Sequence, residues 1–383
     1  MRLGRCFAAA VAQMSMWSSI VVGDFAILPP AFELHGRESI QRVIVVASGQ
    51  QTKSTGNQLP EYGSLVQSDE MTLRSSDESV IRVEDEIVYP VGGGMANVEA
   101  WLAGHIVASA TVRVDAMHLP HQWSFRNEVQ SVLARQGCNM GACHGALAGK
   151  GGFRLSLRGY DADADYFTIA REVRGRRIEI ADPGRSLLVA KPTGALPHKG
   201  GLRLDVNSRD YRVVSQWIAD GAVGPSSDDA RLTHLSVSPK QSRLRPSDQT
   251  RILVSAHYDD GRIVDVSHWA KFSATDEAVA SVDDDGLVRV RGSGEAAVLV
   301  WFGSRVELAR MTVPYDNAVP ESVFAAAPKR NFIDEINLKQ LQTLDLPPSP
   351  RVDDLAFLRR ATIDTVGRLP TAAEQRRFSN ELA

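Results

Sequence analysis

Two cysteines and a histidine lie close together in the chain and could take part in chemistry. Cys138 and Cys143 are separated by Asn139-Met140-Gly141-Ala142, and His144 follows the second cysteine directly. In a Cys-x-x-Cys-His motif, two thiols form thioether bonds to a haem and the histidine ligates its iron. The gap between the cysteines is wider here, so the pattern predicts a covalent haem c site of unusual spacing, with His144 as the proximal iron ligand.

A second iron ligand is expected further along the chain, before the last helix of this region. A Met-Pro pair commonly occupies that place in cytochromes c, whereas this chain has Leu196-Pro197-His198-Lys199. His198 is therefore the candidate distal ligand, and a bis-histidine iron has a lower potential than a His/Met iron because the axial ligands tune it. An open sixth position, which permits peroxide or oxygen chemistry, is the alternative.

Three other interpretations of these residues stay open. A structural disulfide between Cys138 and Cys143 is sterically feasible and favoured in an oxidising compartment. A zinc site of Cys138, Cys143, His144 and His198 is less favoured because the adjacent Cys143 and His144 point in different directions. A catalytic Cys-His pair lacks an orienting third group. We predict no catalytic residue, and we expect an electron-transfer protein with an unidentified redox partner rather than an enzyme.

The N-terminus has the order of a secretory signal peptide. Arg2 and Arg5 precede a mostly apolar run over residues 6–23, which ends in small residues. Polar residues interrupt this run, and no other apolar stretch is long enough to span a membrane. We predict a signal peptide over residues 1–23 and an exported protein (periplasmic, at the cell surface or secreted) without a transmembrane span in the mature chain.

Length and composition set wide limits on the class of protein. The 383 residues predict two or three domains at about 100–200 residues each. Hydrophobic residues make up 43% of the chain and charged residues 23%, as in ordinary globular proteins. A formal net charge of -3 gives no reason to expect a nucleic-acid partner, whose binders carry basic patches.

Two segments have short β-prone runs divided by polar turns. In residues 26–117 the clearest runs are 43–47, 80–83 and 106–114, and residues 231–315 repeat the pattern more regularly. The second segment resembles the bacterial Ig-like domains of group 2, and the first looks like a divergent copy. The resemblance implies two all-β Ig-like sandwiches for surface display or adhesion, with a polysaccharide or protein ligand at the cell surface.

Residues 123–225, between the two β segments, contain two stretches with apolar residues at helical spacing. These are 125–133, which runs toward Cys138, and 211–218, which ends at Gly221. Two helices that bracket a Cys-His site are the plan of a small, mainly α, cytochrome-c-like domain. Another small α-rich domain with two core helices is the alternative.

A cluster of aspartates follows the cysteine motif. Asp161, Asp163 and Asp165 have the spacing of a calcium loop, but Tyr166 occupies the position where such a loop needs glycine. Capping of a helix N-terminus explains these aspartates better.

Several motifs together resemble a known family. They are Gly137-Cys138-Asn139-Met140-Gly141-Ala142-Cys143-His144-Gly145, Gly151-Gly152-Phe153-Arg154-Leu155-Ser156-Leu157-Arg158-Gly159-Tyr160-Asp161, Asp182-Pro183-Gly184-Arg185-Ser186-Leu187-Leu188 and Trp217-Ile218-Ala219-Asp220-Gly221-Ala222. This set is similar to the cytochrome-c-like domain of large exported planctomycete proteins. In that family the domain lies beside Ig-like domains and precedes large domains of unknown function.

The C-terminal part of the chain fits the same resemblance. A linker is predicted over residues 316–330, and residues 331–383 resemble the helical start of the first of those large domains, here truncated. Thr371 and Glu374 form a predicted capping box for its last helix.

Overall fold

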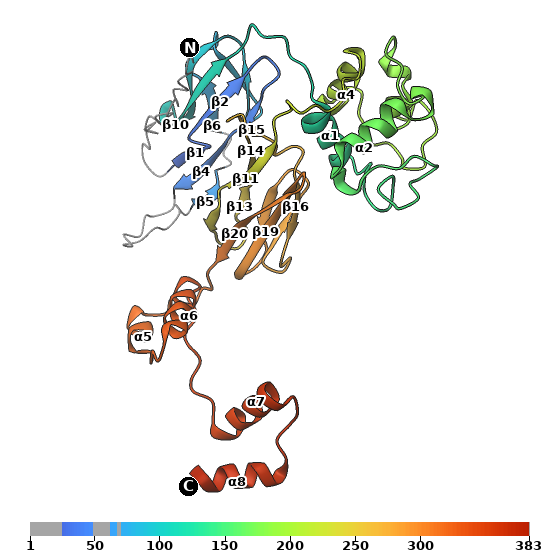
Figure 1. Ribbon diagram of the computed structural model, residues 1–383. Coiled ribbons are helices and arrows are strands. Elements are labelled where there is room, and N and C mark those ends of the chain that lie inside the picture. Colours follow the sequence, from blue (N-terminus) through green and yellow to red (C-terminus); the bar gives the residue numbers. More distant parts are fainter. Residues whose placement is uncertain (1–24, 49–61, 67–69, 383) are drawn as a thin grey trace, which may run out of the picture. The chain divides into compact units, whose positions relative to one another are not determined.

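The computed structural model describes residues 25–48, 62–66 and 70–382, so the predicted signal peptide lies outside the described residues. The chain divides into two compact units, residues 1–313 and 314–383. The first unit holds two β-sandwiches and the helical segment that links them (Figure 1).

Among the described residues, the first sandwich contains ten strands, and the predicted β-prone runs 43–47, 80–83 and 106–114 are three of them. They are β1 (Phe25–Leu28), β2 (Ala31–His35), β3 (Gln41–Arg42), β4 (Ile44–Ser48), β5 (Tyr62–Leu65), β6 (Met71–Ser75), β7 (Ile81–Glu84), β8 (Ile87–Pro90), β9 (Gly94–Leu102) and β10 (His105–Asp115). One sheet has the order β2-β10-β9-β6, and β3-β8-β7 form another. Ile81, Val98 and Val112 have no exposed surface in the core between them, because successive residues of a strand face opposite sides of a sheet.

The second sandwich has the strands that the clearer β pattern predicts. They are β11 (Leu232–Ser238), β12 (Gln241–Arg243), β13 (Gln249–Arg251), β14 (Leu253–Tyr258), β15 (Ile263–Asp265), β16 (Lys271–Ala274), β17 (Ala280–Val282), β18 (Leu287–Val290), β19 (Gly294–Phe302) and β20 (Arg305–Val313). Its long β19–β20 hairpin pairs without a register shift from Gly294↔Val313 to Phe302↔Arg305.

The two sandwiches are connected by hydrogen bonds between their strands. The strands of both contribute to one sheet of order β1-β4-β5-β12-β20-β19-β16, which crosses between them where Tyr62 pairs with Ser242. The buried Asp265 of β15 accepts a hydrogen bond of 2.6 Å from the backbone N–H of Arg42 in β3. A buried carboxylate is retained only where such donors satisfy it, so this contact fixes one sandwich against the other.

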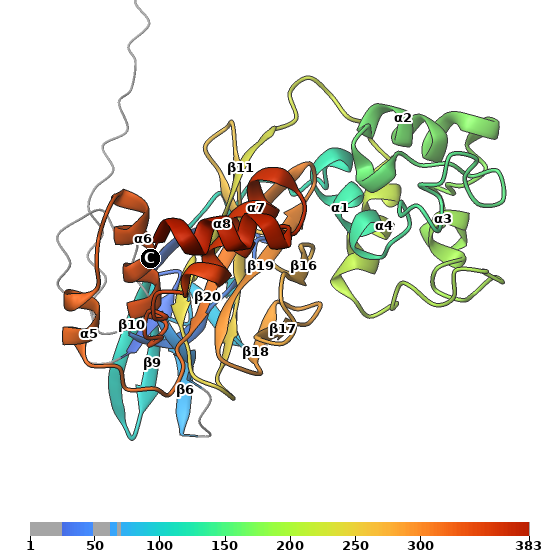
Figure 2. The same cartoon turned by 90° about the horizontal axis from the view of Figure 1, so that it is seen from below.

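The segment between the sandwiches is built from short helices and turns (Figure 2). Its helical elements are η1 (Phe125–Val129), α1 (Gln130–Arg135), η2 (Leu157–Gly159), α2 (Ala162–Tyr166), η3 (Phe167–Arg171), η4 (Glu172–Gly175), η5 (Pro183–Arg185), α3 (Leu187–Ala190) and α4 (Arg209–Ala219). Both predicted helical faces are confirmed, since Val129, Val132, Val214 and Trp217 are buried. A mainly α cytochrome-c-like domain is not shown, because long turns occupy most of residues 138–156 and 191–208.

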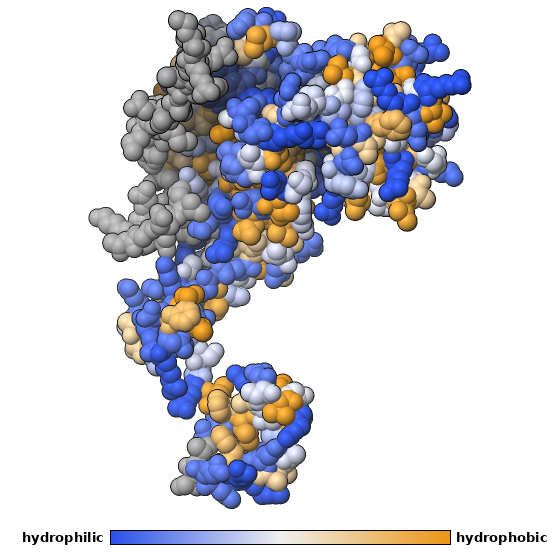
Figure 3. All heavy atoms as spheres, viewed as in Figure 1, coloured by the Kyte–Doolittle hydropathy of each residue, from blue (hydrophilic) through white to orange (hydrophobic). Residues whose placement is uncertain are grey.

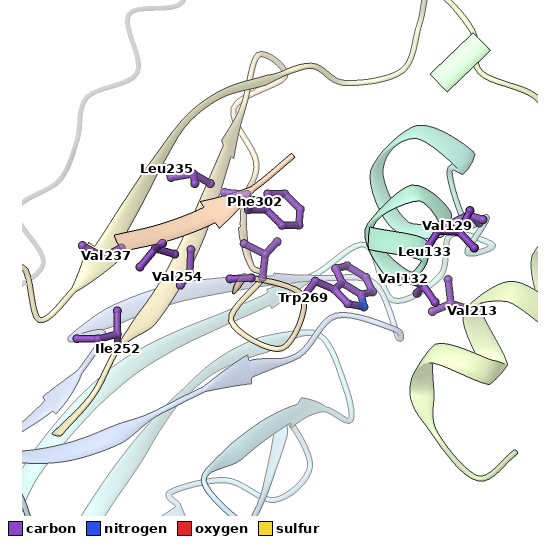
Figure 4. Close-up of a cluster of buried hydrophobic side chains, with 14 of the residues drawn as sticks. Val129, Val132, Leu133, Val213, Leu235, Val237, Ile252, Val254, Trp269 and Phe302 are labelled. Carbon is purple, nitrogen blue, oxygen red and sulfur yellow. The ribbon is translucent and has the colours of Figure 1, made fainter. Parts of the chain in front are cut away.

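This central segment packs against the second sandwich through a shared core. Trp269, which follows β15, points toward helix α1 and its Val132 and Leu133 (Figure 4). Its indole N–H donates a hydrogen bond of 2.9 Å to Asp210 of α4. A buried indole usually finds a partner for this donor, so Trp269 sets both the packing and the orientation of the contact.

The second unit, residues 314–383, contains four helices among its described residues. They are α5 (Glu321–Ala326), α6 (Phe332–Thr343), α7 (Asp354–Val366) and α8 (Ala372–Leu382). Helix α5 lies inside residues 316–330, so the segment predicted as a linker contains one short helix. The predicted capping box is confirmed, because Thr371 and Glu374 exchange hydrogen bonds at the start of α8. In the described part of the chain, no helix has the length and apolarity to cross a membrane.

Candidate functional site

The cysteine-histidine motif forms a tight loop directly after helix α1. The backbone N–H of Cys138 bonds to the carbonyl of Leu133 at 2.9 Å, and that of Cys143 bonds to Met140 at 2.9 Å. The N–H of His144 then returns to the carbonyl of Cys138 at 3.0 Å. These bonds close the loop on itself, so the wide spacing between the cysteines still brings the backbone of His144 back to Cys138.

Glycine is needed at the position that follows the histidine. A Cβ atom on Gly145 would lie 2.1 Å from the carbonyl oxygen of Asn139, which is far inside contact distance. The obstacle is backbone rather than a flexible side chain, so no rotamer change can relieve it. Gly145 thus allows the two ends of the loop to approach each other.

His144 is oriented through one nitrogen of its ring. Its Nδ1 lies 2.9 Å from the carbonyl oxygen of Phe153, and the two rings pack with centroids 4.5 Å apart. A carbonyl only accepts, so Nδ1 carries the proton and Nε2 keeps its lone pair. Histidines that ligate metals are commonly held in this way by a backbone carbonyl. Burial lowers the pKa of His144, which favours the neutral, ligating form.

His198 has the same local arrangement on the second loop. Its Nδ1 lies 2.9 Å from the carbonyl oxygen of Gly201, which leaves Nε2 as its free nitrogen. The charge of His198 also contributes to the lowered pKa of His144, so the two imidazoles interact electrostatically. Both predicted iron ligands thus have Nδ1 on a backbone carbonyl, and their pairing across one iron stays a prediction.

A buried carboxylate fastens the chain that follows this loop. Asp165 of α2 accepts hydrogen bonds from the backbone N–H of Ser156 at 2.5 Å, from its hydroxyl at 2.7 Å, and from Nε2 of Gln130 at 3.0 Å. Asp161 caps α2 by accepting from the N–H of Ala164, which confirms the predicted capping role. Because Asp165 is 1% exposed and satisfied by protein donors, its function is structural.

The two cysteines of the motif are free thiols in the structure rather than a disulfide. Burial is the main cause that raises the pKa of Cys138 to about 11, and the thiol packs against the hydrophobic core. Among the residues the structure describes, no group of three or more His, Cys, Asp or Glu side chains is placed to hold a metal ion, so the zinc interpretation gains no support.

The donor set fits a covalently bound haem better than it fits zinc. Two uncombined thiols can become neutral thioethers, and the neutral His144 is held through Nδ1. The two loops also expose large apolar side chains, with Leu147 85% and Leu202 72% exposed. Apolar surface of this kind marks a ligand or partner site, and haem has large apolar faces. The carbonyls of Phe153 and Gly201 that orient the histidines have no sequence signal, because every residue carries a carbonyl.

Comparison with known proteins does not assign the chain to a family. No family model matches, and no curated protein matches. Among solved structures, the S-layer protein SbsC domains 5-6 is 9% identical with a TM-score of 0.28, over 78% of this chain and 100% of that chain. SbsC domains 4 and 5 give 9% identity and a TM-score of 0.20, over 70% of this chain and 89% of that chain. The Escherichia coli adhesin FdeC is 10% identical with a TM-score of 0.17, over 78% of this chain and 65% of that chain. Likenesses at these scores carry no argument about this chain.

Proposed function

We propose that this chain is an exported Ig-like scaffold whose central segment attaches one haem and transfers electrons. Cys138 and Cys143 would form the two thioethers, with His144 as the proximal ligand and His198 as the distal one. A haem bound there would supply a one-electron iron couple. The partner that donates or accepts the electron is a separate redox protein or small molecule.

One observation carries this proposal. Two histidines, in loops far apart in sequence, each have Nδ1 fixed by a backbone carbonyl, at Phe153 and at Gly201. Both therefore offer Nε2, and one of them follows a free cysteine directly. A histidine used only for packing has no need of this arrangement, whereas an axial ligand needs a fixed ring and a free nitrogen.

The remaining chemistry follows from what these side chains do. The carbonyls of Phe153 and Gly201 hold each ring in one tautomer, so no proton has to leave Nε2 before it ligates. Burial keeps His144 neutral, and the burial of Cys138 keeps its sulfur in apolar surroundings. Two neutral nitrogen ligands in a partly buried site favour a low potential.

The direct test is to produce the full chain in a host with cytochrome c maturation and measure its intact mass and visible spectrum. We expect a mass gain of about 616 Da and a pyridine haemochrome band at about 550 nm. His198→Ala should change the spectrum while the mass gain remains. His234→Ala, which alters a histidine stacked on His257 in the second sandwich, is the matched control and should change neither. A mass lower by about 2 Da with no Soret band would indicate a disulfide and overturn the proposal.

A non-haem surface protein is the second candidate, and the contact between the sandwiches favours it. The seven-stranded sheet and the Asp265–Arg42 hydrogen bond connect both sandwiches into one unit. Such a connection suits a spacer or adhesin that must transmit force without bending. In that case the cysteines would form a Cys138–Cys143 disulfide, and the same mass measurement decides between the candidates.

A further inference from the structure

A cavity of about 420 Å³ lies between the central segment and the second sandwich. Its walls come from helix α1, from the turn around Arg158–Gly159–Tyr160, and from β16 and the end of β19. Cavities that bind small molecules usually measure about 300–1,000 Å³. Neither thiol of the motif nor His144 lines the cavity, although Asn139 and Met140 of the same loop do, so the cavity adjoins the candidate haem site without sharing its predicted ligands.

The charge of the lining is entirely positive. Arg126, Arg158, Arg231 and Lys271 line the cavity, and no Asp or Glu does. Arg126 is paired with carboxylates outside the lining, but no described carboxylate forms an ion pair with the other three cations. Burial lowers the pKa of Lys271, and the charge of Arg158 lowers it further, although Asp284 acts in the opposite direction. The cavity therefore has positive charge that a ligand could neutralise.

Two buried amides in the lining each have one atom without a hydrogen-bond partner. Oε1 of Gln130 and Nδ2 of Asn139 are both unsatisfied, although these residues are only 5% and 1% exposed. Unpaired buried polar atoms cost free energy and are rare in folded proteins. One is an acceptor and the other a donor, and both lie close to Gly159, where an added Cβ would meet them at 2.2 Å and 3.3 Å. Both residues line the cavity, so unpaired amide atoms lie at its wall.

Aromatic rings and a strained turn complete the wall. Tyr160 is 74% exposed and Trp301 is half-buried, and both line the cavity. Exposed flat rings beside cations provide surfaces on which the C–H face of a sugar ring stacks. Arg158 has a φ of 59°, in the left-handed region that non-glycine residues rarely adopt. Such strain is concentrated at binding and catalytic sites.

From these observations we infer that the cavity binds a carboxylated sugar, namely a uronate unit of an acidic polysaccharide. The guanidinium of Arg158 and the ammonium of Lys271 bind the carboxylate, since charge-assisted hydrogen bonds are the strong ones. Gln130 and Asn139 bind hydroxyl groups, and Tyr160 and Trp301 contact the ring. This inference is independent of the haem proposal, because the two sites share no ligating residue.

The test measures binding of digalacturonate to the full chain by calorimetry, with the neutral disaccharide cellobiose as the comparison. We expect digalacturonate to bind and cellobiose to bind at least tenfold more weakly. The double variant Arg158→Gln/Lys271→Gln should weaken digalacturonate binding at least tenfold. Lys240→Gln, which removes a lysine paired with Glu307 at the surface of the same sandwich, is the control and should bind as the parent does.

A second variant separates a binding role from a structural one. Asn139→Leu removes an unsatisfied buried amide, so the thermal unfolding midpoint should not fall while digalacturonate binding weakens. Equal binding of the neutral disaccharide, unchanged binding by the double variant, or no binding at millimolar ligand would each overturn the inference. A loss of binding by Lys240→Gln equal to that of the double variant would show non-specific attraction and overturn it as well.

Discussion

The central segment and the second sandwich share one hydrophobic core, yet they are built differently. In the sandwich, the β19–β20 hairpin pairs in continuous register and buries alternate residues. In the central segment, Val173 and Arg174 adopt positive φ, and several large apolar side chains are exposed. Figure 3 shows such hydrophobic side chains interspersed with hydrophilic ones over the face in view. The regular region supplies stability, and the departures from local preference gather in the region that holds both candidate sites.

The contact between the two regions should carry the largest single effect. Trp269 is 4% exposed and bonds to Asp210 across the contact. Replacing a buried tryptophan with alanine leaves a cavity, so Trp269→Ala should lower the free energy of unfolding by about 3–5 kcal/mol. Urea denaturation measures it. Trp101 is a half-exposed residue of β9, and Trp101→Ala is the control. It should lower the free energy of unfolding by less than half of the change for Trp269→Ala. Equal losses would show that the contact adds nothing beyond ordinary burial.

In the loop that contains the cysteine motif, one glycine substitution should lower stability strongly and another should have little effect. Gly145→Ala places a Cβ against the carbonyl of Asn139, and we expect a loss of about 2–3 kcal/mol in the free energy of unfolding. Gly141→Ala, in the same loop, meets only a Leu157 methyl at 4.0 Å and should change stability by about 0.5 kcal/mol or less. Denaturant titration of both variants compares them. Similar losses would mean that the loop relaxes freely.

A buried acid in the central segment should make stability fall as pH rises. Burial raises the pKa of Glu128 from 4.5 to about 7, while Oε2 accepts a hydrogen bond from the N–H of Ser124. Between these pH values the folded form binds more protons than the unfolded form, so the free energy of unfolding decreases by about 3 kcal/mol over this range and is constant at higher pH. Glu128→Gln keeps the acceptor and should remove this slope. Thermal unfolding of the parent and of Glu128→Gln from pH 4.5 to 8 measures this pH dependence. The same pH dependence in both proteins would contradict the prediction.

A histidine in the second sandwich should give a smaller slope of opposite sign. Burial lowers the pKa of His257, which also stacks on His234 with centroids 4.0 Å apart. Below the unfolded pKa the unfolded form binds more protons, so stability falls as pH drops below about 6.5. The group is partly exposed and screened, and the effect should stay under about 1 kcal/mol. His257→Gln should remove it in a thermal scan from pH 5 to 7, whereas His105→Gln at the exposed β9–β10 turn should not.

The strands and the faces of the helices could be predicted from the sequence. The β-prone runs 43–47, 80–83 and 106–114 correspond to β4, β7 and β10, and each end differs by one residue from the prediction. Helix α4 buries Val214, Trp217 and Ile218 as their spacing predicts. These predictions succeed because the burial pattern depends on local periodicity, which the sequence shows directly.

The sequence by itself predicts which residues of the central segment could ligate iron. Cys138, Cys143 and His144 are neighbours in the chain, and His198 was the only distal histidine that the position of the last helix favoured. The sequence analysis predicts more helix in residues 123–225 than the structure contains. Glycine-rich turns replace helix there, and they depend on close backbone contacts such as that between Gly145 and Asn139. It also gave no sign of the cavity.

Only the tertiary structure decided how distant residues meet. The Trp269–Asp210 bond and the joining of Gln130, Arg158 and Lys271 around one cavity depend on partners far apart in sequence. The carbonyls that orient His144 and His198 lie only nine and three residues further along the chain, but the loop conformation that places them has no sequence signal. The order of residues determines local periodicity, whereas the position of a partner depends on packing of the whole unit. Hydrogen-bond partners and cavities are therefore decided by the fold.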